Sequence, residues 1–154
     1  ERGEEIPAVA GLSKDAGPAG DGKNHKNFQT PVSYQESDQG LGWFVRVAGA
    51  PSDRNFVNFY FDTGLSYKGL IPGRDDDALG LAFAYAQLSP GARDGLRDEG
   101  SSPAGAEMVI ELTYQIQVTG WFMIQPDLQY IINPGGTSDF ENALVIGGRA
   151  AIVF

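Results

Sequence analysis

The sequence predicts an all-β fold, an antiparallel up-and-down transmembrane β-barrel. Three observations predict it. Runs of about 10 to 14 residues alternate apolar and polar side chains, Gly/Pro/Asp clusters separate these runs, and no apolar stretch approaches the roughly 20 residues that a transmembrane helix requires. A strand that crosses a bilayer at a tilt needs about 9–11 residues, whereas an ordinary strand has about five or six. The length of the alternating runs therefore favours a sheet that crosses a membrane.

The clearest alternation lies in residues 107–119, where even positions are apolar and odd positions are polar except for Val109. A tight turn at Gly120 follows, and residues 122–133 repeat the pattern. Pro126 falls on the apolar register of this second run and lacks a backbone donor, so a local irregularity is expected there. With the weaker alternations included, we predict about seven strands and no helix: 28–35, 41–50, 55–68, 78–88, 107–119, 122–133 and 143–154.

The composition of the two registers distinguishes a membrane barrel from a soluble β-sandwich, which is the main alternative. The water face of a sandwich is usually rich in Lys, Glu and Thr. Here the polar register mixes Gly, Ala and Gln with occasional charges. Aromatic residues lie near the ends of the runs, as in the interfacial girdles of a barrel: Trp43, Tyr67, Tyr85, Phe122, Tyr130 and Phe154.

The chain divides into residues 1–27, predicted to be a loop that is extracellular or disordered, and residues 28–154, predicted to hold the strands. The first segment is rich in Gly, Pro, Ala and charge and shows no signal peptide, so we interpret the chain as a processed or truncated product. An open sheet edge in lipid would leave backbone groups unpaired, at several kcal/mol each. Either missing N-terminal strands of the same barrel or further chains must close the sheet, and the first is favoured.

Connection lengths predict an orientation. If the C-terminus is periplasmic, 70–77 and Gly120 are periplasmic turns, and 51–54, 90–105 and 134–142 are extracellular loops. The longer connections then fall mostly outside, as is typical of outer-membrane barrels.

Composition excludes several functions. There is no Cys, and the one His, His25, lies in a Gly/Lys/Asn-rich stretch, so thiol catalysis and a Ser-His-Asp triad are not expected. The net charge of −9 argues against a nucleic-acid partner. The run Asp75-Asp76-Asp77 lacks the alternate spacing of a calcium loop and favours a solvated turn. Neither a metal nor another cofactor is predicted.

Specific segments resemble the carbohydrate-selective porins of the OprB-like family. They are Gly69-Leu70-Ile71-Pro72-Gly73-Arg74, Tyr114 to Trp121, Gln125-Pro126-Asp127-Leu128-Gln129-Tyr130, Asn133 to Gly136, and Ala143 to Ala150. The resemblance covers about residues 40–154. It implies that the chain holds about seven C-terminal strands of a sixteen-stranded porin of the bacterial outer membrane, which passes small saccharides passively and has no catalytic residues.

The resemblance also implies a pore lined by arginines, for which Arg46 and Arg149 lie on the polar register. A passive pore needs groups that exchange hydrogen bonds with hydroxyls without holding them tightly. Carboxylates and amides supply acceptors, and aromatic rings stack on pyranoses; for each residue a structural salt bridge or plain wall is the alternative. The other pore-lining candidates are Phe44, Asn58, Tyr60, Asp62, Glu107, Glu111, Gln125 and Asp127.

Phe154 and Ile152 are expected to anchor the last strand in lipid and to resemble the terminal signal that barrel-assembly machinery reads. The expected partners are therefore small saccharides, outer-membrane lipid, the assembly machinery and the missing strands, and a homo-oligomer stays open. Two other functions also stay open: a soluble carbohydrate-binding β-sandwich, and an outer-membrane barrel for other small solutes such as organic acids.

Overall fold

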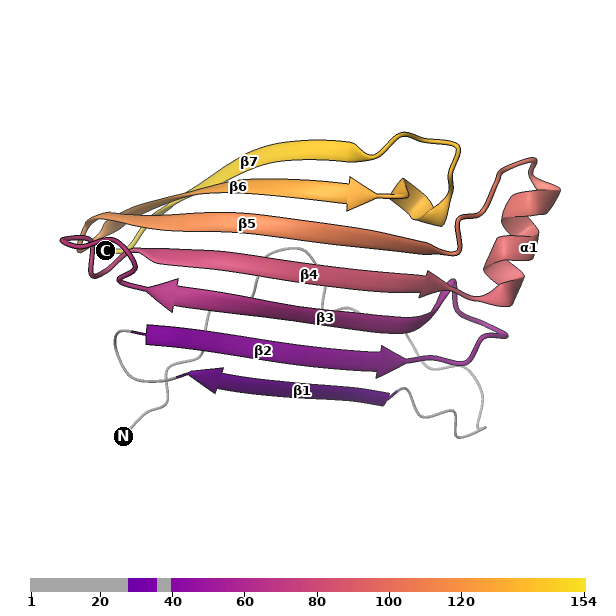
Figure 1. Cartoon of the computed structure of the whole chain (residues 1–154), viewed down its shortest axis with the longest axis horizontal. Helices are drawn as coiled ribbons and strands as arrows, with labels where there is room; N and C mark the ends of the chain where they lie inside the picture. The colour runs from indigo at the N-terminus through magenta and orange to yellow at the C-terminus, as the bar shows by residue number, and fades with distance from the viewer. Residues whose placement is uncertain (1–27, 36–39) are drawn as a thin grey trace.

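The computed structural model describes residues 28–35 and 40–154, which form one antiparallel sheet of seven strands in the order β1 to β7 (Figure 1). Every strand pairs with the next one along the chain, which is the up-and-down connectivity that the sequence predicts. The strands are β1 (Phe28–Gln35), β2 (Gly40–Gly49), β3 (Val57–Lys68), β4 (Ala78–Leu88), β5 (Ala106–Thr119), β6 (Phe122–Ile132) and β7 (Ala143–Ile152).

The prediction of no helix is wrong in the longest connection. Residues Pro90–Asp98 form helix α1, and Pro134–Gly136 form a short 3-10 turn, η1. Ser89 caps α1 by accepting a hydrogen bond from the Ala92 N–H at 3.1 Å, and Pro90 occupies the first turn, where its missing N–H costs nothing. Two glycines inside the helix lower its intrinsic propensity, which is why the segment was predicted as a loop.

The strand pairing is interrupted near Pro126 and shifts register at two other places. Opposite Pro126, the β5–β6 ladder passes from Thr113↔Asp127 to Ile116↔Ile124 in the same register without pairing the residues between them, which confirms the expected irregularity. The register itself shifts between Gln117 and Thr119, next to the Gly120 turn, and between Val57 and Phe59 on β3. The last strand was predicted to run to residue 154. It ends at Ile152, and one further backbone bond joins Val153 to Trp121 at 2.8 Å.

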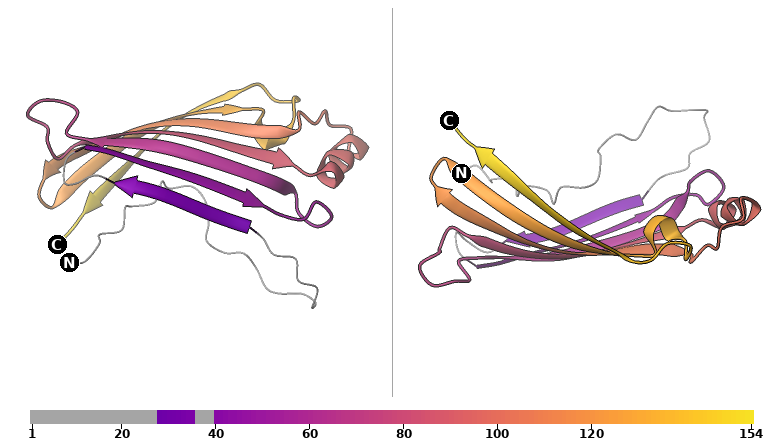
Figure 2. Two further views of the ribbon diagram at one scale, coloured as in Figure 1. Left: turned by 60° about the horizontal axis from the view of Figure 1, so that its bottom comes forward. Right: turned by 90° about the horizontal axis from the view of Figure 1, so that it is seen from above.

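The sheet is curved and twisted rather than flat (Figure 2). Among the described residues, the only buried apolar side chains are Leu88 and Ala106, so the sheet has no packed core of the ordinary kind. Large apolar side chains are instead exposed on one face: Leu41, Trp43, Phe59, Leu65, Tyr67, Leu81, Ile110, Leu112, Leu128, Tyr130, Leu144, Ile146 and Ile152. A continuous exposed apolar face of this extent requires an apolar environment.

The connections gather at two opposite ends of the sheet. The turn between β3 and β4, the β5–β6 turn and the C-terminal end of the chain lie at one end (Figure 1). The β2–β3 connection, α1 and η1 lie at the other. This grouping matches the predicted division into 70–77 and Gly120 on one side and 51–54, 90–105 and 134–142 on the other. Neither helix in the described part of the chain is long and apolar enough to cross a membrane.

Candidate functional site: the polar face of the sheet

The face opposite the exposed apolar residues carries the predicted polar register. Neighbouring strands bring its members to the same height: Gly64, Ala82, Glu111 and Gln129 form one row, and Ser66, Gly80, Thr113 and Asp127 form the next. The central strand β4 contributes small side chains here, namely Ala78, Gly80, Ala82, Ala84 and Ala86, and Leu88 follows on the same register at the end of the strand. This face, called the wall below, therefore lacks long side chains in its middle and carries polar side chains on both sides of β4.

Arg46, Asp62 and Tyr60 form the first polar cluster, on β2 and β3. Arg46 and Asp62 are opposite one another in the ladder, and the guanidinium binds the carboxylate with two nitrogens, Nε to Oδ1 at 2.9 Å and Nη2 to Oδ2. The Tyr60 hydroxyl donates to Oδ2 of Asp62 at 3.0 Å, and the Arg46 guanidinium lies 5.8 Å from the Tyr60 ring centroid. Asp62 is only 5% exposed, so its charge depends on these donors.

Glu111, Gln129 and Asp127 form the second polar cluster, on β5 and β6. Gln129 Nε2 donates to Oε2 of Glu111 at 3.1 Å and to Oδ2 of Asp127 at 2.9 Å. One neutral amide thus holds two carboxylates on the same wall. Gln129 was not among the predicted pore residues, although its place on the polar register of 122–133 was visible in the sequence.

The other predicted residues lie apart from these two clusters. Arg149 Nη2 donates to Oε1 of Gln125 at 2.5 Å, nearer the end of the sheet that carries the Gly120 turn. Glu107 accepts a hydrogen bond from the Gly135 N–H at 2.6 Å and so fixes η1 to β5 at the opposite end. Asn58 donates to Ser52 Oγ at 3.3 Å, while its buried Oδ1 has no partner among the described residues.

Three glycines make room for the side chains of this face, and the sequence reasoning did not assign them that role. A Cβ on Gly64 would overlap the Phe44 ring, one on Gly80 would lie 2.6 Å from Thr113 Oγ1, and one on Gly147 would lie 2.5 Å from Asp127 Oδ1. In each case a side chain leans across the neighbouring strand. Phe44 therefore leans over Gly64, on the strand that also carries Asp62 of the Arg46 cluster.

A separate buried cluster closes the β3–β4 turn. Asp77 is 3% exposed and accepts from Arg74 Nε and Nη2 at 2.7 and 2.8 Å, from the Tyr114 hydroxyl at 2.8 Å and from the Gln117 N–H at 2.9 Å. The Arg74 guanidinium, with the other donors, lowers the pKa of Asp77 below its usual value. The expected solvated turn thus holds for Asp75 and Asp76, which are exposed, and is wrong for Asp77.

The two long connections at the opposite end are joined into one unit. Pro103 and Thr137 form an isolated bridge, and the Ser102 N–H donates to both carboxylate oxygens of Asp139, at 3.1 and 3.0 Å. The Ser102 N–H thereby lowers the pKa of Asp139. Gly136 packs against the buried Leu88 side chain with no space for a Cβ.

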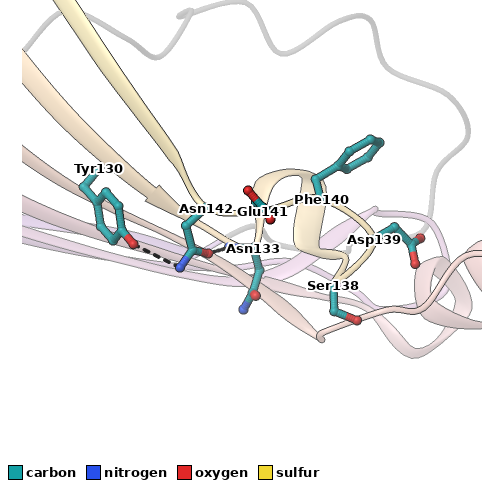
Figure 3. Close-up of a pocket in the computed structure, with 7 residues that line it drawn as sticks. All are labelled: Tyr130, Asn133, Ser138, Asp139, Phe140, Glu141 and Asn142. Atoms are coloured by element: carbon teal, nitrogen blue, oxygen red, sulfur yellow. Dashed lines mark hydrogen bonds between the residues drawn. The ribbon is translucent and has the colours of Figure 1, made fainter.

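A shallow polar depression of about 540 Å³ lies beside this unit (Figure 3). Its lining residues are Tyr130, Asn133, Ser138, Asp139, Phe140, Glu141 and Asn142. Asn142 Nδ2 donates to the Tyr130 hydroxyl at 3.1 Å, and its Oδ1 accepts from the Asn133 N–H at 3.2 Å, so this side chain ties the ends of β6 and β7 together.

Comparison with known proteins decides what kind of sheet this is. The family described as carbohydrate-selective porin, OprB family, matches residues 9–154. The chain belongs to the OprB family. It is therefore an outer-membrane β-barrel protein of the porin class, and the predicted resemblance is confirmed and extends upstream of residue 40. The family is one of channels rather than enzymes, and a soluble sandwich is excluded.

Individual relatives agree with this OprB-family assignment. Porin B of Pseudomonas aeruginosa is 30% identical over 132 residues, 77% of this chain and 29% of that protein. The putative porin QuiX of Acinetobacter baylyi is 24% identical over 140 residues, 79% of this chain and 31% of that protein. The high-pH structure of Pseudomonas putida OprB matches with a TM-score of 0.71 at 26% identity, covering 80% of this chain and 34% of that one. The chain thus spans about a third of the length of these relatives.

Proposed function

We propose that this chain forms part of the wall of a water-filled pore through which small saccharides diffuse passively across the outer membrane. The observation that carries the proposal is the contrast between the two faces of one OprB-family sheet. One face exposes large apolar side chains, as lipid contact requires, and the other carries hydrogen-bonding groups between small residues.

The chemistry of the polar face suits solutes with many hydroxyls. Arg46, Tyr60 and Arg149 supply donors, and Glu111, Asp127 and Gln125 supply acceptors. Each group already has a hydrogen-bond partner on its own or a neighbouring strand, so a passing sugar exchanges one hydrogen bond for another and is not held tightly. The smooth β4 wall between the two clusters offers no side chain long enough to obstruct the path. No catalytic group is invoked, and we infer that the protein is not an enzyme.

Closure of the barrel requires strands beyond those of this chain. The seven-stranded sheet has two outer edges, β1 and β7, and neither is paired among the described residues. An unpaired edge in lipid costs several kcal/mol for each backbone group. We infer that missing strands of the same protein complete a sixteen-stranded barrel, of which this chain supplies the C-terminal strands.

The same proposal assigns sides and partners. The end with the Gly120 turn is periplasmic, and the end with α1 and η1 is extracellular, since the longer connections of such barrels face outward. Ile152 and Phe154 are exposed, on or beside the last strand, and we assign them to lipid contact and to recognition by the barrel-assembly machinery. A homo-oligomer would use the same apolar face.

The test uses the full-length protein reconstituted in planar bilayers. We expect a channel whose current is reduced by neutral saccharides such as glucose in a concentration-dependent manner. A protein that forms no channel, or whose current ignores every saccharide tested, contradicts the proposal. Unchanged saccharide block in the R46A/R149A double variant would remove these two arginines from the substrate path while leaving the channel itself in place.

A further inference from the structure

The two polar clusters differ in net charge, and this difference bears on which solutes the pore admits. Arg46 forms a two-nitrogen ion pair with Asp62, so the positive charge on β2 is cancelled within the same cluster. Asp62 is buried beneath it, and the Tyr60 hydroxyl adds only a neutral dipole. To a solute in the lumen, the β2–β3 side of the wall is therefore close to neutral.

The β5–β6 side is not neutralised in this way. Glu111 and Asp127 share the amide of Gln129, which orients both carboxylates but carries no charge. Neither carboxylate forms an ion pair with any residue of the described part of the chain, where the five ion pairs are Arg46–Asp62, Arg54–Asp53, Lys68–Asp76, Arg74–Asp77 and Arg97–Asp94. The intervening strand β4 supplies Ala and Gly to this face, with Leu88 at its end, so no cation lies between the clusters.

The other charges of this face lie outside the two rows that hold Glu111 and Asp127. Arg149, bonded to Gln125, lies one row beyond Asp127 toward the Gly120 end, where Lys68 also lies, and Glu107, bonded to Gly135, lies toward the α1 end. At mid-height, where Ala82, Glu111 and Gln129 share one row and Asp127 lies in the next, the described residues of the wall carry two carboxylates and no cation. In the confined water of a lumen, such fixed charges attract cations and repel anions.

We propose that Glu111 and Asp127 are the charge-discriminating residues of this wall, which favours neutral saccharides over anionic ones such as sugar acids and favours cations over anions in ionic current. This inference rests on the proposed function, because it requires the polar face to line a conducting pore. It also disfavours organic acids as the natural solute of the channel. Salt screens exposed charges over about 10 Å at 0.1 M and about 3 Å at 1 M, so the discrimination is strongest in dilute salt.

The experiment compares full-length protein with the E111Q/D127N double variant in bilayers under a KCl gradient. Both substitutions keep the shape of the side chain and an acceptor for Gln129, and heat-modifiable gel mobility verifies that the barrel has formed. The control is D75N/D98N, which removes the same charge from two exposed positions, one in the β3–β4 turn and one in α1, neither of which forms an ion pair in the described part of the chain. We expect the potassium-to-chloride permeability ratio to fall on the order of threefold in E111Q/D127N at 0.1 M salt, less at 1 M, and to change little in the control.

A second readout uses liposome uptake of glucose and gluconate. The double variant should raise the relative rate for gluconate while leaving that for glucose nearly unchanged. If glucose still blocks the channel but both ratios stay at the values of the unaltered protein, or move equally in D75N/D98N, the charge assignment is overturned and the saccharide pore stands. A protein that forms no channel overturns both.

Discussion

The two faces of the sheet share one backbone but satisfy their side chains in opposite ways. On the apolar face, residues such as Leu81, Leu112 and Ile146 are 48%, 43% and 78% exposed, and nothing in the described part of the chain covers them fully, so they require contact with lipid. On the polar face, the charged groups are bonded to other protein groups, most of them on a neighbouring strand or in an adjoining turn. The apolar face is therefore stabilised by contact with its apolar environment, whereas the polar face is stabilised by hydrogen bonds and ion pairs among its own side chains. Substitutions on the two faces should therefore differ in the size of their effect on stability and in its physical cause.

The largest effect is expected from a charge placed on the apolar face. Leu81→Arg puts a guanidinium between Leu65 and Leu112 near mid-height, and a charge at the middle of the bilayer costs about 2–4 kcal/mol of barrel stability. Ala82→Arg changes the next residue, which faces Glu111 across the ladder on the polar face, and should cost far less. Urea unfolding of the full-length protein in lipid vesicles measures both. Equal losses would mean that the two faces do not differ in environment.

The next effect concerns the buried carboxylate of the polar face. Arg46→Ala removes both guanidinium bonds and leaves Asp62, 5% exposed, with the Tyr60 hydroxyl as its one remaining side-chain donor. Loss of a charged partner to a buried group costs about 1–3 kcal/mol. Arg149→Ala breaks only an exposed bond to Gln125 and serves as the matched control. The same unfolding assay should give a clearly larger loss for R46A, and a reversed order would contradict the assignment of Asp62 as dependent on Arg46.

A smaller, pH-dependent effect is expected at the β3–β4 turn. Folding lowers the pKa of Asp77 below 3.8, chiefly through Arg74, so its contribution to stability is complete above that value and is lost as the pH falls through the lower folded pKa. Asp77→Asn should therefore destabilise the protein at pH 7, and the gap to the unaltered protein should close in acid below about pH 3.8. Asp75→Asn, at an exposed neighbouring position, should show no such gap. A difference in stability that persists unchanged at acid pH would show that the charge of Asp77 does not stabilise the turn.

The smallest effect is expected where the two long connections meet. Asp139→Ala removes the acceptor for the Ser102 N–H without touching the strands. Global stability should hardly change, but cleavage within residues 89–105 by an added protease should become faster. Glu141→Ala, at an exposed position of the same connection, is the control. Identical cleavage of both variants would argue that the connections are not held together by Asp139.

Most of the sheet could be predicted because alternation along a strand is a local property of the sequence. Residues 107–119 show this best, and their long period-2 run is β5 almost to the residue. The polar clusters could be predicted only in part. That Arg46 lies opposite Asp62 depends on a register between strands, and the role of Gln129 depends on which of its neighbours point the same way.

Helix α1 and the burial of Asp77 could not be predicted for a related reason. The α1 segment has low intrinsic helix propensity, and the helix begins at the Ser89 cap with Pro90 in its first turn. Asp77 has the same local sequence signature as the exposed Asp75 and Asp76. Only the folded position of Arg74, Tyr114 and Gln117 separates it from them.

The central claim is that one face of this sheet meets lipid and the other meets water, and cysteine scanning along β5 tests it most directly. The chain contains no Cys, so a single introduced thiol at each position from 109 to 115 reports cleanly if the remainder of the full-length protein is also made Cys-free. In intact outer membranes, we predict that a membrane-impermeant maleimide labels Cys at Glu111, Thr113 and Gln115 but not at Ile110 or Leu112. Labelling that ignores the alternation, or favours the even positions, would contradict the account.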